Sequence, residues 1–377
     1  MLRQPWKIVL GLLIPAMSVS AGGNGFSIQS QASVWWILHE QVENGLVQNG
    51  TLEPATDEAS GFNLKAGRLA FVWNGLDGRL KSVIQLRLEE RADILDAYGS
   101  YTVKSWFTIS AGQMRIPSTR EAMSPFYKLD FISKSTFAKH VSDYALSRTP
   151  YISSVMSVKS YDRDTGIALS GALSRLSWRF MVSNGIGAGC YIGGREDTGF
   201  IYTNRFGDYY YGARVELLLF NSLTLGLHAS QNSHQNVALS DRGPVLDFDR
   251  SVWTADLQAA LRWGQRIYAF FGQGNMNDCS LSLNYLFEYE GWGISLFQPL
   301  MAEKLEFGGR MDRFETNYKT GSIATIQNNW TFGLKYCPEK QWHVFLNYIL
   351  KETQSEWPDL NDDILFVDLR FLFSSSP

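Results

Sequence analysis

The side chains that most often carry catalysis are scattered in this sequence of 377 residues. A hydrolase needs a nucleophile with a general base within hydrogen-bond reach. None of the five histidines belongs to a Gly-x-Ser-x-Gly or comparable motif. They are His39, His140, His228, His234 and His343. We therefore expect no enzymatic activity.

Metal, cofactor and nucleic-acid sites are not indicated either. The paired carboxylates Glu196-Asp197 and Asp362-Asp363 lack the spacing of a calcium loop. The three cysteines are too widely spaced for a zinc or redox motif, and they allow at most one disulfide whose partners the sequence leaves open. A formal net charge of -3, without a basic helix or a Gly-rich phosphate loop, disfavours nucleic acid. We expect no metal, no cofactor and no nucleic-acid partner.

The chemistry that the sequence does offer is electrostatic. Charged residues recur at alternate positions of segments about ten residues long, so one face of each segment is apolar and the other is polar. In residues 80–89, Leu80, Ile84 and Leu88 share one face, and Lys81 and Arg87 share the other. Parity predicts that the basic residues Lys81, Arg87, Arg175, Arg179, Arg214, Arg262 and Arg310 face a polar lumen, together with the acidic residues Glu89, Glu216, Asp256, Glu288, Glu306 and Asp312. A ring of one sign would favour ions of the opposite sign.

A second concentration of charge lies in the longest link between such segments, residues 118–150. Its basic residues outnumber its acidic ones and give it a net charge of +2; they are Arg120, Lys128, Lys134, Lys139 and Arg148. A link of over thirty residues in a compact domain either folds back against it or is unstructured. Because five aromatic residues could anchor it, we predict that this loop folds inward and forms a constriction. An external loop with solvated lysines is the alternative.

The N-terminus resembles an export signal. Arg3 and Lys7 precede an apolar run at residues 8–17, and Val19-Ser20-Ala21 supplies the small residues that a signal peptidase recognises. The run is about ten residues long, too short to span a bilayer as a helix. We expect residues 1–21 to be a cleaved signal peptide and residues 22–377 to form one domain, with an uncleaved N-terminal strand as the alternative.

Beyond Ala21 the sequence alternates with a period of two, and it has neither a sustained helical period nor an apolar run of eighteen residues. The segments are joined by short turns, as at residues 74–78 and 220–222, and by long links, as at 118–161, 186–208 and 235–249. Aromatic residues make up 14% of the chain and gather at segment ends, as at Trp35-Trp36, Tyr209-Tyr210-Tyr211 and Trp292. Short turns opposite long loops, with rings at both interfaces, are typical of bacterial outer-membrane barrels.

About seventeen such segments can be counted, but a single-chain barrel normally has an even number of strands. The sequence therefore predicts an all-β fold, a transmembrane antiparallel β-barrel of sixteen strands with an aqueous lumen and a long inward-folded loop. The segment that contains Tyr285, Phe287 and Tyr289 is predicted to turn these rings outward. A secreted, non-enzymatic β-sandwich that binds a partner is the alternative.

Short motifs occur in a fixed order across residues 60–373. They are Asp96-Ala97-Tyr98; residues 111–117 with Glu121; Arg163-Asp164-Thr165-Gly166; Ser183-Asn184-Gly185; Gly309-Arg310-Met311-Asp312; Phe332-Gly333-Leu334-Lys335-Tyr336; Leu346-Asn347-Tyr348; and Asn361-Asp362-Asp363. Together they resemble the phosphate-selective porins O and P family. The resemblance implies a sixteen-stranded, homotrimeric pore in the bacterial outer membrane that passes anions by diffusion.

Two features depart from that family. The phosphate-specific members line the lumen with arginines and lysines, whereas the inward set here mixes both signs, and Ser374-Ser375-Ser376-Pro377 follows the aromatic end of the last segment. We therefore expect an outer-membrane channel for small hydrophilic solutes with a weak anion preference, in contact with outer-membrane lipid. A non-selective channel, or one specific for another small solute, is the alternative.

Overall fold

The computed structural model describes residues 19–21, 24–39, 47–48, 51–52, 59–88, 93–125, 128–142, 162–185, 209–238, 245–278, 285–301, 304–318, 322–354 and 363–374. The strands are β1 (Val19–Ala21), β2 (Asn24–His39), β3 (Val47–Gln48), β4 (Thr51–Leu52), β5 (Ala59–Gly75), β6 (Leu80–Arg87), β7 (Asp93–Lys104), β8 (Phe107–Arg115), β9 (Arg163–Leu173), β10 (Leu176–Ser183), β11 (Tyr210–Phe220), β12 (Leu223–Ala238), β13 (Val245–Ala260), β14 (Arg266–Asp278), β15 (Tyr285–Met301), β16 (Leu305–Tyr318), β17 (Ser322–Glu339), β18 (Trp342–Gln354) and β19 (Ile364–Ser374). Two short helices are α2 (Arg120–Met123) and α3 (Thr136–Ser142). No helix in these ranges is long and apolar enough to cross a membrane.

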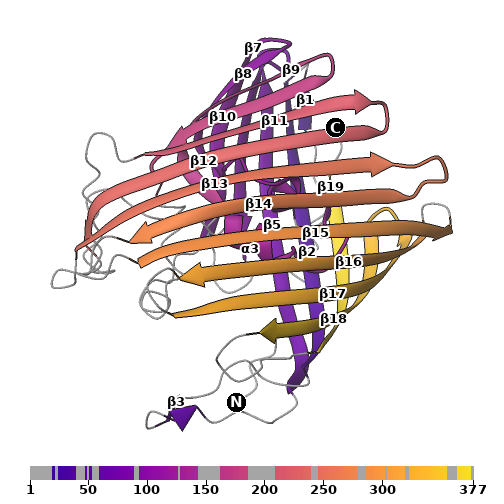
Figure 1. Cartoon of the computed structure of the whole chain (residues 1–377). Helices are drawn as coiled ribbons and strands as arrows, with labels where there is room; N and C mark the ends of the chain where they lie inside the picture. The colour runs from indigo at the N-terminus through magenta and orange to yellow at the C-terminus, as the bar shows by residue number, and fades with distance from the viewer. Residues whose placement is uncertain are drawn as a thin grey trace.

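Sixteen of the strands form one closed antiparallel ring (Figure 1). The ring runs from β10 to β19, continues through β2 and β5 to β9, and returns to β10. β19 pairs with β2 from Ile364 opposite His39 to Ser374 opposite Gln29. The short β1 pairs with the first residues of β2. Since closure leaves no sheet edge, the ladder satisfies its own backbone groups, and the predicted sixteen-stranded barrel is confirmed.

The ring has an apolar outer face and a mixed inner face. Along β15, Ile294 and Leu296 are 50% and 51% exposed. The alternate residues Ser295 and Phe297 are only 3% and 5% exposed. Other exposed apolar residues repeat this parity on their own strands: Ile84, Ile167, Leu217, Leu227, Phe332 and Leu346. An apolar outer band of this kind is typical of a surface that contacts lipid. The buried residues at alternate positions point toward the interior of the barrel.

The parity predicted for the first half of β15 is wrong. Tyr289 is 3% exposed and belongs to the buried cluster that includes Phe270 and Phe314. Its hydroxyl accepts a hydrogen bond from Nε of Arg250 at 2.9 Å. Glu288, predicted to face inward, therefore has the outward parity. The prediction failed because it assigned the rings of this segment to the lipid face, whereas the ring of Tyr289 fills space beside Gly274, where a Cβ would overlap it.

The turn between β5 and β6 shows how the short connections are built. The amide of Gly78 donates to the carbonyl of Gly75 at 3.1 Å. Leu76 and Asp77, the two central residues, have φ of 50° and 53°, which is the geometry of a type I′ hairpin turn. The twist of this turn matches that of the paired strands, so it joins them directly.

At the other end of the barrel, the link predicted at residues 235–249 is partly strand. β12 continues to Ala238 and β13 begins at Val245, so both strands include residues of this link.

The outward parity can be tested by paired substitutions on β6. Ile84→Arg places a charge on the lipid face, where we expect a cost of about 2 to 4 kcal/mol near the bilayer midplane. Gln85→Arg, one residue on, has the inward parity and should assemble like the parent. The fraction of protein in the heat-modifiable folded form on a gel measures the difference. Equal folded fractions would show that the register of β6 in the membrane is wrong.

Candidate functional site

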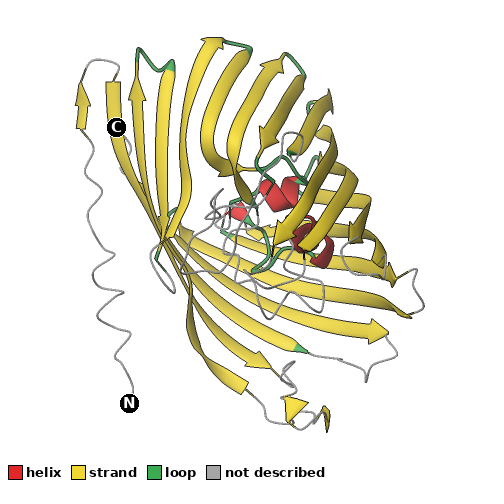
Figure 2. Cartoon of the chain, turned by 90° about the vertical axis from the view of Figure 1, so that its left-hand side faces the viewer, coloured by secondary structure: helices red, strands yellow, loops and turns green. Residues whose placement is uncertain are grey.

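The candidate site is the chain that follows β8, residues 116–125 and 128–142, here called the inner segment. Both helices belong to it, and Figure 2 shows them surrounded by the strands of the ring. The hydroxyl of Thr119 caps α2 by accepting from the amide of Ala122 at 3.1 Å. Ser135 accepts from the amide of Ala138 at 3.3 Å at the start of α3. These caps satisfy helix amides that have no partner within the helix.

Buried rings dock the inner segment on the barrel wall. Phe137 is fully buried and stacks on Phe270 with ring centroids 5.7 Å apart. It lies against Gly272 and Gly291, where a Cβ would overlap the ring. Glycine at these two strand positions therefore allows the segment to approach the wall closely.

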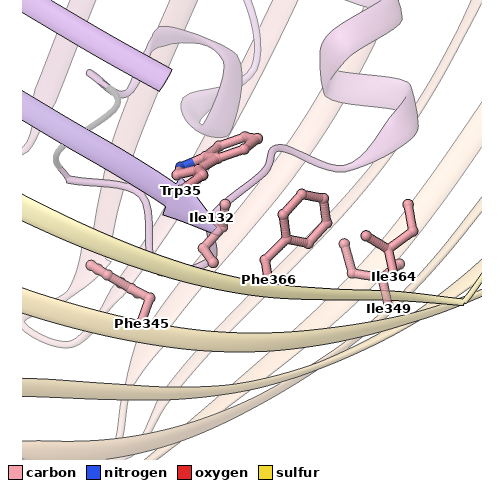
Figure 3. Packing of buried hydrophobic residues seen from close by; sticks show 6 residues of the cluster. All are labelled: Trp35, Ile132, Phe345, Ile349, Ile364 and Phe366. Carbon is pink, nitrogen blue, oxygen red and sulfur yellow. The ribbon is translucent and has the colours of Figure 1, made fainter. Parts of the chain in front are cut away.

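A second apolar contact surrounds Ile132. This side chain is 1% exposed and packs in a cluster with residues of β2, β18 and β19. Figure 3 shows it beside Trp35 and Phe366, on the inner side of these strands. Its amide donates to Oδ1 of Asn347 at 2.9 Å, so a buried backbone donor is satisfied where the ring of strands closes.

Arginines of the wall bind backbone carbonyls of the segment. Arg214 forms a bidentate pair with Asp256, at 2.7 and 2.8 Å, and donates to the carbonyl of Ser118 at 3.0 Å. The same Asp256 accepts from the amide of Arg120 at 3.2 Å. Because a guanidinium has five donors in a planar fork, it can satisfy a carboxylate and a carbonyl together.

Arg310 does the same from β16. Its Nη1 lies 3.1 Å from Glu121 and 2.9 Å from the carbonyl of Ser133, and its Nε lies 3.0 Å from Asp312. Glu121 also accepts from the amide and the hydroxyl of Ser135, at 2.9 and 2.6 Å. Both helices are therefore tied to one guanidinium.

Two more arginines hold the chain between the helices. Arg370 pairs with Asp368 at 2.6 Å and donates to the carbonyls of Leu129 and Phe131, at 3.2 and 3.4 Å. Arg266 forms a bidentate pair with Asp130, at 2.9 and 3.1 Å, and a 2.6 Å contact with Glu306. The inner segment is thus bound by side chains from β11, β14, β16 and β19.

A cationic cluster flanks the other side of the segment. Asp162 lies 2.6 Å from Arg163, 3.4 Å from Arg115 and 4.0 Å from Lys134, and Lys134 donates to the carbonyl of Ala122 at 2.8 Å. Burial alone would raise the pKa of Asp162, but the three cations outweigh it and hold that pKa well below its usual range. Burial lowers the pKa of Lys134, and Asp162 opposes that shift.

The predicted loop cations have different surroundings. Lys128 and Lys139 are exposed, and Arg120 and Lys134 are partly buried, Lys134 in the Asp162 cluster. Arg148 lies outside the described residues. The geometry therefore brings Arg120 and Lys134 against the barrel wall and leaves Lys128 and Lys139 at the surface of the segment.

The predicted lumen residues also divide. Arg214 and Arg310 are buried in the contacts described above, and Arg179 donates to the carbonyl of Arg115 at 2.9 Å. Lys81 and Arg87 lie on β6 with the parity of the buried Val83, and Glu89 lies outside the described residues.

Two of these predictions are corrected by the structure. Arg175 and Arg262 lie in the turns after β9 and β13, not on the wall. The chain reverses there because Ser174 and Gly264 adopt φ of 50° and 83°.

Sequence reasoning missed several of the residues that hold the segment. Arg266 and Arg370, and the carboxylate Asp368 that pairs with Arg370, were not among the predicted inward residues. The signal for one pair was present, since Asp368 and Arg370 are two residues apart in a strand whose intervening Leu369 is 41% exposed. For the others, the partner is distant in sequence, as with Arg266 and Asp130.

Structure comparison finds the fold of bacterial outer-membrane porins. The outer-membrane channel DcaP of Acinetobacter baumannii matches with a TM-score of 0.63 at 10% identity, over 96% of this chain and 100% of that one. OmpT of Vibrio cholerae, in vitro folded and in its trimer form, matches with a TM-score of 0.58 at 10% identity, over 93% of this chain and 99% of that one. Salmonella typhi OmpF, in complex with daunomycin, matches with a TM-score of 0.57 at 11% identity, over 95% of this chain and 100% of that one. No family model and no curated protein matches the sequence.

Loss of one anchor should release the inner segment. Arg310→Met leaves Asp312, which is fully buried, and Glu121 without their guanidinium, at a cost of about 3 to 5 kcal/mol. We expect limited trypsin digestion of the folded protein, followed by mass spectrometry, to show faster cleavage after Lys128, Lys134 and Lys139.

The control for this prediction is Arg313→Met on the same strand. Arg313 pairs with Glu315 two residues on, as Arg310 does with Asp312, but its side chain is 37% exposed and has the outward parity. An exposed pair contributes about 0 to 1 kcal/mol, so this variant should be cleaved like the parent. Equal cleavage of the two variants would exclude Arg310 as an anchor.

Proposed function

We propose that this protein is an outer-membrane porin, a passive diffusion channel for small hydrophilic solutes with a weak preference for anions. The observation that carries the proposal is a closed sixteen-stranded ring with an apolar outside and an inside that bears charged residues on most strands. A ring of this size is too wide for its own side chains to fill. The fold shared with DcaP, OmpT and OmpF supports the same class.

The proposed anion preference rests on the charges that remain after pairing. The clusters around Arg214, Arg266, Arg310, Arg370 and Asp162 combine both signs. Those at Arg214 and Arg310 hold one guanidinium against two carboxylates, and the one at Asp162 holds three cations against Asp162 and Asp96. Arg120 and Arg179 form no ion pair with any described residue, and the Arg179 guanidinium donates to the carbonyl of Arg115. These cations would raise the local concentration of anions.

Other properties are part of the same proposal. We infer export by the signal peptide of residues 1–21 and assembly as a homotrimer, as the trimer form of OmpT suggests for a barrel of this fold. The phosphate-selective porins O and P family remains the resemblance of the sequence motifs. The mixed inner charges argue for a weaker selectivity than a phosphate-specific lining would give.

The selectivity can be tested at the two exposed lysines of the segment. Lys128→Glu with Lys139→Glu changes the local charge by four units and leaves Lys134 in the Asp162 cluster unchanged. Reversal potentials in planar bilayers across a salt gradient should shift toward cations. The shift should be larger at low salt, where the Debye length exceeds its value of about 8 Å at 0.15 M.

The matched control changes the same charge elsewhere. Lys304→Glu with Lys340→Glu alters two exposed lysines in the turns that follow β15 and β17. We expect a much smaller shift from this pair, because these turns lie at an end of the barrel. Similar shifts from both pairs would mean that the segment is not the filter, and the absence of any channels would refute the porin proposal.

A further inference from the structure

A cavity of about 80 Å³ lies between the inner segment and the barrel wall. Arg120, Leu129 and Phe131 of the segment form one side, and Gln258, Tyr268, Ser295 and Phe297 of β13, β14 and β15 form the other. The space can hold several water molecules or part of a small organic solute. Since charged and apolar groups face each other across it, the question is which solute satisfies both.

The carboxylates at this cavity are already neutralised. Asp130 accepts two hydrogen bonds from Arg266, at 2.9 and 3.1 Å. Glu121 pairs with Arg310 at 3.1 Å and accepts from Ser135. Each carboxylate therefore has a guanidinium partner and offers less to a cationic ligand than an unpaired carboxylate would.

The donors at the cavity are not engaged in the same way. Within the described parts of the chain, the Arg120 guanidinium has no ion pair, and the Gln258 carboxamide and Ser295 hydroxyl make no hydrogen bond. The oxygen of Tyr268 accepts from the amide of Glu121 at 3.4 Å, which leaves its proton to donate. A guanidinium, an amide and two hydroxyls that converge on one space suit an oxyanion.

The remaining lining is apolar. Phe131 and Phe297 lie with ring centroids 5.1 Å apart, and Leu129 extends the same surface. A guanidinium lies against each ring, since Arg310 is 4.9 Å from the centroid of Phe131 and Arg266 is 4.8 Å from that of Phe297. These contacts hold the rings in place as a fixed apolar wall.

We propose that this cavity is a binding subsite for an organic carboxylate with an apolar body, its carboxylate on Arg120 and its body against Phe131 and Phe297. Inorganic phosphate could use the donors but would gain nothing from the rings, and it would lose hydration beside them. The proposal rests on the proposed channel function and names the class of solute that the channel retains in transit.

Binding is measured in two independent ways, with phenylacetate as the probe and acetate and phosphate as comparison anions. Calorimetric titration of the folded protein in detergent measures equilibrium binding whether or not the protein conducts. Block of chloride current in planar bilayers measures the same site during transport. We expect saturable binding and block by phenylacetate, and much weaker effects of acetate and phosphate.

Two variants of equal charge locate the site. Arg120→Gln should weaken phenylacetate binding about tenfold or more, because it removes a hydrogen-bonded charge. Lys139→Gln removes a cation of the same segment that does not line the cavity, and it should change binding less than about twofold.

The outcomes separate this subsite from the channel function. Equal weakening by Arg120→Gln and Lys139→Gln would show general attraction of anions and overturn the subsite, as would equal binding of acetate, phosphate and phenylacetate. A conducting protein that does not bind phenylacetate would keep the channel and lose the subsite. A protein that binds phenylacetate through Arg120 without conducting would keep the subsite and lose the channel.

Discussion

Closure of the sheet between β19 and β2 is the constraint from which the other features of the molecule follow. In hydrocarbon no water is present to pair with a free strand edge, so the strands must form a ring. Sixteen strands make that ring too wide to be filled by their side chains. They leave a lumen, and the described residues that lie within it are those between β8 and β9 (Figure 2).

The inner segment is held mainly by charged and polar contacts, and a few buried aromatic rings pack it against the barrel wall. Its helices are short, and α2 has only four residues, so their own backbone bonds cannot keep them in place. Arg214, Arg310 and Arg370 donate to its carbonyls while pairing with carboxylates of their own strands. Each contact is directional, so together they specify one position of the segment. An apolar contact of the same area is not directional and would specify the position of the segment less well.

The sequence was sufficient for the fold and insufficient for the site, and the reasons are physical. A period of two is a local property of each strand, so it predicted the closed barrel and the outward parity of residues such as Ile84 and Leu217. It failed at Tyr289, because an aromatic side chain can fill the interior as well as face lipid, and parity alone does not distinguish the two. The pairing of Arg310 with Glu121 joins residues 189 positions apart, and nothing local records it.

Pairing also changes how the charges of the interior should be counted. A list of inward arginines and carboxylates suggests a lining of mixed sign and little selectivity. Once buried pairs are formed, as between Arg214 and Asp256, each pair acts at a distance as a dipole whose field falls off faster than that of a single charge. The field in the lumen is then set by the charges of either sign that lie outside such pairs. Arg120 is one of them, and its backbone amide is held at the wall by Asp256, so its charge stays within the length of one side chain from the wall.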